Sequence, residues 1–265
     1  MKNMLLLIDF SPMSNLVIKQ ALILAKLNNN KIIFCHVSNS NAENKINEIN
    51  ESFKPFLDKA SDAGVPYQTY IPSGNLNEGV KTTVAKFNAD IILAGTHGKQ
   101  GILQHLFGSK IFNLIQEVNS PFLVLNKESK VVEDGFKNVL VPVSHHTTYL
   151  KMLEKTTQLL AINGKIIIFA IVKYGLLLDR EVKINVKTAQ QFLNSKGIEN
   201  EYLEIVSDQY TKGYSQETLK YIKDQEIDLI TIFTKVSDKK ASFALTDKEN
   251  IILNDIGITV LCVDC

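Results

Sequence analysis

Short apolar runs alternate with longer amphipathic stretches along the chain. In the first half the apolar runs cover residues 4–9, 32–37, 66–71, 91–95 and 121–125. They are continuous and rich in β-branched residues, which is typical of strands buried on both faces of a sheet. Between the first two runs, Ser11 looks like an N-cap, Pro12 opens a helix, and apolar residues recur at helical spacing as far as Leu27. This alternation predicts an α/β fold with a parallel sheet and helices on both of its faces.

The whole pattern occurs twice. The opening run KNMLLLI at 2–8 returns as KNVLVPV at 137–143, and the run that starts at Asp90 returns at Asp228. The last run, 120–125, returns at 258–263. A repeat this long indicates duplicated domains rather than a solenoid. We therefore predict two tandem domains, 1–127 and 137–265, with the polar and charged stretch Asn126–Phe136 as the linker.

Composition narrows the range of partners. The chain has 265 residues, 45% of them hydrophobic, and its 29 basic and 28 acidic residues leave a net charge of +1. A chain with so little net charge lacks the positive electrostatic potential typical of nucleic-acid-binding proteins. It also lacks the basic face typical of proteins that bind membrane surfaces. Cys35, Cys262 and Cys265 form neither a disulfide framework nor a zinc pattern. We expect a cytoplasmic protein with reduced thiols and no nucleic-acid or membrane partner, with Cys262 in the core and Cys265 in a free tail.

Three glycines follow the fourth predicted strand. The sequence reads G-T-H-G, nine residues, and then G-S-K at the start of a predicted helix. Gly95 and Gly98 allow a sharp turn and a close approach of the main chain to a ligand. At Gly108 the unpaired N–H groups and the positive end of the helix dipole favour a phosphate. Ser109 adds a hydroxyl donor and Lys110 a cation, so the segment predicts a phosphate site; the alternative is that the glycines only make turns.

Further candidates lie at the carboxyl ends of the strands, where open α/β sheets bind ligands. Asp9 follows the first strand and could accept from ribose hydroxyls or an adenine amine; alternatively, it caps the next helix together with Ser11. Val37 ends the second strand, where its main chain could meet a base edge, or it is an ordinary core valine. Ala94 offers a small floor under a nucleotide. His97 could contact a phosphate, or it is a solvated loop residue.

This combination resembles the nucleotide-binding branch of the universal stress protein family, whose motif is G-2x-G-9x-G(S/T). The resemblance covers the whole chain as a tandem pair, but the ligand motif occurs once. It implies two five-stranded, Rossmann-like domains of the HUP type, paired through antiparallel fifth strands as an intramolecular pseudo-dimer. It also implies ATP, or AMP or ADP, as the ligand, with or without Mg²⁺. The residues expected to bind it are Asp9, Ser11, Val37, Ala94, Gly95, His97, Gly98, Gly108, Ser109 and Lys110.

The second copy has lost the residue types of this motif. In a gapless alignment of Asp90 with Asp228, the motif positions become Phe233, Val236, Thr246 and Asp247, and Ser144 stands opposite Asp9. Asp247 would place a negative charge where a phosphate should lie. Thr246–Glu249 also looks like a capping box, which would satisfy the helix N–H groups internally. We predict no nucleotide site in this copy. The pair His145–His146 lacks further ligands, so we expect solvated histidines and no metal site.

Three functions compete. The first is a stress-response protein that binds an adenine nucleotide in its first domain and acts as a regulatory or signalling module. The second is a ligand-free structural or interaction module. The third is an enzyme that hydrolyses ATP, slowly at most, because the chain has no Walker sequence and no evident water-activating base. We expect no catalytic residues. A homodimer of the whole chain remains open.

Overall fold

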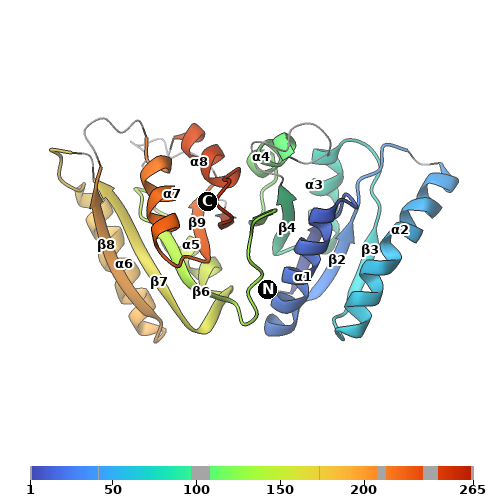
Figure 1. The fold of residues 1–265 in the computed structure, drawn as a ribbon, viewed down its shortest axis with the longest axis horizontal. Coiled ribbons are helices and arrows are strands. Elements are labelled where there is room, and N and C mark those ends of the chain that lie inside the picture. The colour runs from blue at the N-terminus through green and yellow to red at the C-terminus, as the bar shows by residue number, and fades with distance from the viewer. Residues whose placement is uncertain are drawn as a thin grey trace.

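The computed structural model describes residues 2–40, 42–96, 108–172, 174–207, 213–234 and 244–263. In this part of the chain ten strands form one sheet, in the order β3-β2-β1-β4-β5-β10-β9-β6-β7-β8. Figure 1 shows the two halves of the chain side by side, with β3 and α2 at one end and β8 and α6 at the other. None of the described helices has the length and apolar character needed to cross a bilayer.

Each half follows the predicted alternation of strand and helix. The first half contains β1 (Asn3–Leu7), α1 (Pro12–Asn28), β2 (Lys31–Cys35), α2 (Glu43–Asp62), β3 (Tyr67–Tyr70), α3 (Leu76–Phe87), β4 (Ile91–Thr96), α4 (Gly108–Glu117) and β5 (Phe122–Asn126). The second half contains β6 (Phe136–Pro142), α5 (Tyr149–Thr157), β7 (Leu160–Val172), α6 (Arg180–Ser195), β8 (Glu199–Val206), α7 (Ser215–Asp224), β9 (Leu229–Phe233), α8 (Leu245–Ile252) and β10 (Thr259–Val263). The predicted strands of the first half agree with the observed ones to within two residues.

Helices cover both faces of the sheet, which explains why the strands are continuously apolar. Met4 and Leu6 of β1 face a core cluster that includes buried residues of α1, α2, α5 and α6. Leu5 and Leu7 face the opposite cluster, which includes residues of α3, α4, α7 and α8. Side chains of a strand alternate between its two faces, so the same short run supplies both cores. The predicted α/β fold is confirmed.

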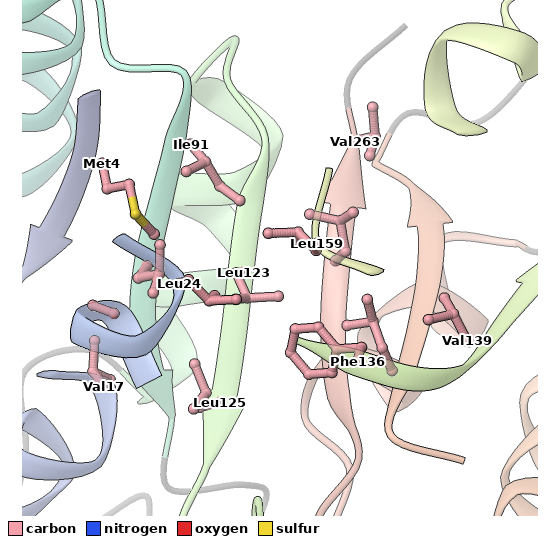
Figure 2. Close-up of a cluster of buried hydrophobic side chains, with 14 of the residues drawn as sticks. Met4, Val17, Leu24, Ile91, Leu123, Leu125, Phe136, Val139, Leu159 and Val263 are labelled. Carbon is pink, nitrogen blue, oxygen red and sulfur yellow. The ribbon is translucent and has the colours of Figure 1, made fainter. Parts of the chain in front are cut away.

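The halves join through β5 and β10, which pair antiparallel with Leu123 opposite Leu261. The other strand pairs of the described sheet are parallel. Each core cluster contains residues from both halves, and Figure 2 shows Leu123 of β5 facing Phe136 and Leu159 of the second half. The predicted intramolecular pseudo-dimer is therefore confirmed, and the two halves share continuous hydrophobic cores.

Buried amides set the register of this junction. The Asn126 side chain donates to the main-chain oxygen and to Oδ1 of Asn254, both at 3.0 Å. Asn254 in turn donates to the carbonyl groups of Ile251 and Ile258. The linker is also held in place, because the buried Gln20 of α1 accepts from Val132 N–H at 3.0 Å and donates to its carbonyl at 3.4 Å. Buried polar groups favour one arrangement because any other would leave them unsatisfied.

Candidate functional site

The predicted site residues gather at the carboxyl edge of the first half of the sheet. Leu7, the last residue of β1, pairs with Cys35, the last residue of β2, and β1 also pairs with β4. Asp9 and Val37 therefore follow neighbouring strand ends, and Gly95 lies near the end of β4. Gly108, Ser109 and Lys110 form the first turn of α4, where Lys110 is exposed. His97 and Gly98 lie outside the described residues.

Asp9 contacts the start of α1 through one of its two oxygens. Its Oδ1 accepts from Ser11 N–H and from Ser14 Oγ, both at 3.0 Å. Its Oδ2 makes no hydrogen bond to any described residue, and the side chain is partly exposed. Contact with the start of α1 and binding of a ligand are therefore compatible, because they would use different oxygens of Asp9.

Ser11 differs from the prediction. It occupies the N-cap position of α1, but its side chain makes no capping hydrogen bond. Its Oγ is buried and has no hydrogen-bond partner among the described residues, although the residue as a whole is only 4% exposed. A buried hydroxyl without a partner costs about 1–3 kcal/mol, so Ser11 Oγ is a polar group that a ligand or a water molecule could satisfy.

Phe10 turns the chain out of the sheet immediately after Asp9. It has a φ of +60°, a left-handed conformation that is unusual for an aromatic residue. Its ring packs against His36 and Phe53, with centroids 4.8 and 5.1 Å away. His36 Nδ1 lies 2.8 Å from the Ile8 carbonyl, and burial lowers the histidine pKa. This turn ends β1 beside the still-extended chain that follows β2.

Val37 has a packed side chain and a main chain that faces away from β3. Its side chain packs on α3, where a Cβ on Gly79 would lie 2.8 Å from Val37 Cγ1. The neighbouring residues His36 and Ser38 donate their N–H groups toward the β3 side, to Tyr70 and Pro72. Main-chain groups of successive residues in a strand point to opposite sides. The N–H and C=O of Val37 therefore face the other side, where β1 has just ended.

Gly95 has a packing role that the sequence did not indicate. A Cβ at Gly95 would lie 2.9 Å from Met13 Cε, 3.1 Å from Met13 Cβ and 3.3 Å from Val17 Cγ2, all in α1. The adjacent Ala94 is 1% exposed and packs in the core beneath α3 and α4. Both residues let helices approach β4 closely, so their small size follows from packing without reference to a ligand.

At the same edge of the second half, side chains fill the space. The Phe233 ring, which aligns with Gly95, lies 4.0 Å from the His146 ring and 6.5 Å from the Tyr149 ring. The helix that follows the first strand is shorter here, with nine residues in α5 against 17 in α1. Burial lowers the pKa of His146 to about 4, and His145 Nε2 lies 3.5 Å from Asp179 Oδ1. The prediction of two solvated histidines was wrong. The described residues contain no cluster of three metal-ligating side chains.

Asp247 closes this edge further. Its helix is capped at Ala244 rather than Thr246, so the predicted capping box is displaced by two residues. One carboxylate oxygen accepts from Ala244 N–H at 3.2 Å. The other accepts from the N–H groups of Tyr214 and Ser215 at 3.1 and 2.9 Å. The sequence indicated an internally satisfied helix but not this second contact, which links α8 to the start of α7.

The first half has an open groove at the corresponding place, between the first turns of α3 and α4. It encloses about 430 Å³ and is lined by Asn75, Leu76, Asn77, Glu78, Lys110, Asn113 and Glu117. A larger cavity of about 600 Å³ lies at the opposite edge of the sheet, beside the linker and Asp228, and holds none of the predicted site residues. The groove depends on how two helices pack, which the sequence pattern does not reveal.

Comparisons with known proteins agree with this architecture. Residues 1–126 match the model of the Universal stress protein family. A universal stress protein from Archaeoglobus fulgidus is similar over 99% of this chain and 96% of its own, with a TM-score of 0.71 and 17% identity. A putative universal stress protein from Pseudomonas aeruginosa covers 99% of this chain and 93% of its own, with a TM-score of 0.65 and 9% identity. No curated relative matches the sequence.

Together these findings define a class of protein: a tandem, Rossmann-like α/β chain whose two halves share one sheet. The first domain, residues 1–126, is the part of the chain that matches the universal stress protein family. The second domain has the same fold, but the side chains of Phe233 and Asp247 fill space at the carboxyl edge of its strands.

Proposed function

We propose that the first domain binds an adenine nucleotide, ATP or else AMP or ADP, and that its occupancy makes the chain a regulatory or signalling module of the stress response. One observation carries the proposal. The main chain of Val37 faces the end of β1, and Asp9, which follows β1, has an oxygen that accepts from no described residue. A main-chain donor and acceptor pair and a carboxylate oxygen are thus available beside the end of β1.

The residues at this edge suit the parts of a nucleotide. The N–H and C=O of Val37 offer the donor and acceptor pair that an adenine edge requires. Asp9 can accept from ribose hydroxyls, and the buried hydroxyl of Ser11 needs a partner. The first turn of α4 supplies main-chain N–H groups and the exposed Lys110 for phosphates. Mg²⁺, when it accompanies the nucleotide, would be held through the phosphates.

Calorimetric titration tests this proposal. We expect ATP to bind at one site per chain, and Gly98→Val and Gly108→Val to abolish binding. Thr246→Val is the matched control, because Thr246 is the exposed counterpart of Gly108 in the second domain. Parallel titrations with ADP and AMP, with and without Mg²⁺, would define the preferred ligand. Two equal sites, or no site at all, would refute the proposal.

A ligand-free interaction module is the second candidate, and the contacts of Gly95 favour it. Packing against Met13 and Val17 accounts for this glycine without a nucleotide. Native mass spectrometry of the freshly purified protein separates the candidates, because a bound nucleotide would add its mass to the chain. Under the first proposal steady-state ATP hydrolysis stays below about 1 per second, the low end for ordinary enzymes.

A further inference from the structure

The second domain holds a buried carboxylate between the N-termini of two helices. Asp247 is 6% exposed. Its Oδ1 accepts from the N–H groups of Tyr214 and Ser215 at the start of α7, and its Oδ2 accepts from Ala244 at the start of α8. Main-chain donors converging on one anion are how proteins hold a bound phosphate or carboxylate. Here the anion is part of the chain.

The first domain has a glycine at the same place and no described carboxylate beside it, although its N-cap Asn75 is extended where Tyr214 is helical. Gly74 and Gly213 each precede the N-cap of the helix after the third strand of their domain, with φ values of +108° and +99°. A Cβ at Gly213 would lie 2.7 Å from Asp247 Oδ1, whereas a Cβ at Gly74 meets no described atom within 4 Å. Ser109 aligns with Asp247. No described atom of the first domain therefore takes, beside Gly74, the place that Asp247 takes beside Gly213.

The charges around the open groove favour an incoming anion. Its two carboxylates, Glu78 and Glu117, both lie near Lys81 Nζ, at 3.5 and 3.3 Å. Lys110 lines the same groove and forms no ion pair with any described residue. The positive dipole ends of α3 and α4 both lie at this groove.

We propose that Asp247 is an internal anion that permanently links α7 to α8, in the arrangement that α3 and α4 of the first domain adopt when an external phosphate bridges them. The part that concerns the first domain rests on the proposed nucleotide site, whereas the part that concerns Asp247 does not. The two domains would then differ in how they respond to a ligand. Ligand occupancy changes the contact between two helices in one domain, while the other domain stays in the occupied arrangement.

Reciprocal substitution tests the proposal. Asp247→Ser should accelerate hydrogen exchange at Tyr214 and Ser215 N–H by about tenfold or more, since it removes about one hydrogen bond to a charged group from each. Formate or inorganic phosphate should restore protection, whereas sodium chloride at equal ionic strength should not. The matched control is Asp228→Ser. Asp228 accepts from two main-chain N–H groups at the opposite edge of the sheet, and its loss should not be rescued by anions at α7.

Asp247→Asn keeps an acceptor and leaves no space for formate, so it covers the case in which Asp247→Ser fails to fold. It should fold with partial protection at Tyr214 and Ser215 and show no rescue. Unchanged exchange in the serine variant, or restoration by sodium chloride as well as by formate, would overturn the proposal.

In the first domain, Ser109→Asp should protect the N–H groups of Asn75 and Leu76 and prevent ATP binding. Wild-type protein should gain the same protection on addition of ATP. If Ser109→Asp protects these groups but the wild-type chain binds no nucleotide, the internal-anion proposal stands and the proposed function fails. If ATP binds but neither ATP nor Ser109→Asp alters exchange at α3, the proposed bridging of α3 and α4 is refuted while the nucleotide site remains.

Discussion

Replacing Gly95 by alanine adds one methyl group against α1. Met13 Cε, 2.9 Å from the added Cβ, is the end of a flexible side chain and can move. Met13 Cβ at 3.1 Å and Val17 Cγ2 at 3.3 Å can yield only if α1 shifts. Overpacking of this kind costs about 1–3 kcal/mol, and the reduced entropy of the unfolded chain returns about 0.4–1 kcal/mol. We expect a net loss of about 1–2 kcal/mol.

Thermal unfolding measures this loss. For a chain of this size, 1 kcal/mol corresponds to roughly 2–4 °C in Tm, so Gly95→Ala should lower Tm by about 2–8 °C. Met13→Ala provides the control through a double-mutant cycle. Without the Met13 Cε contact, the added methyl group should cost less, with a coupling energy of about 0.5–1.5 kcal/mol. A Gly95→Ala variant that unfolds like the wild type but no longer binds ATP would refute the packing argument.

Three further predictions concern buried groups. Asn254→Ala should lower the free energy of unfolding by about 1–3 kcal/mol, because Asn126 loses its partner at the junction; an unchanged urea midpoint would contradict this. The folded pKa of His146, about 4, lies below its unfolded value, so the unfolded state binds more protons between pH 6.5 and 4 and stability falls as the pH drops through this range. His146→Leu should show a smaller loss than the wild type over that interval, and equal slopes would exclude His146 as the cause. Burial raises the thiol pKa of Cys35 and Cys262, so mass spectrometry should find both unlabelled by a thiol reagent until the protein is unfolded, and rapid native labelling would show that they are accessible.

The strands and the duplication could be predicted because they depend on local pattern. Strands buried on both faces leave continuous apolar runs, and two copies of one series of runs imply two copies of one sheet. The pairing of β5 with β10 followed from the family resemblance rather than from periodicity. Two exposed apolar edges would favour such pairing, but they do not specify the partner.

Contacts between distant segments could not be predicted. Asp247 contacts Ser215, 32 positions earlier in the chain, and nothing in the spacing of these residues indicates that α7 and α8 meet there. The same holds for Gly95, whose neighbours belong to α1, and for His146, which is covered by Phe233. Residue type suggested a site or a solvated pair in these cases, whereas packing decided the environment.

The antiparallel junction of β5 and β10 has a consequence for how the two halves can diverge. Because β5 and β10 belong to one chain, their association does not depend on protein concentration. The linker keeps the effective concentration of one half near the other high. A separate subunit that pairs with its own copy must satisfy every requirement in a single sequence. Fusion removes that constraint, so one half can specialise as scaffold while its neighbour keeps an open edge.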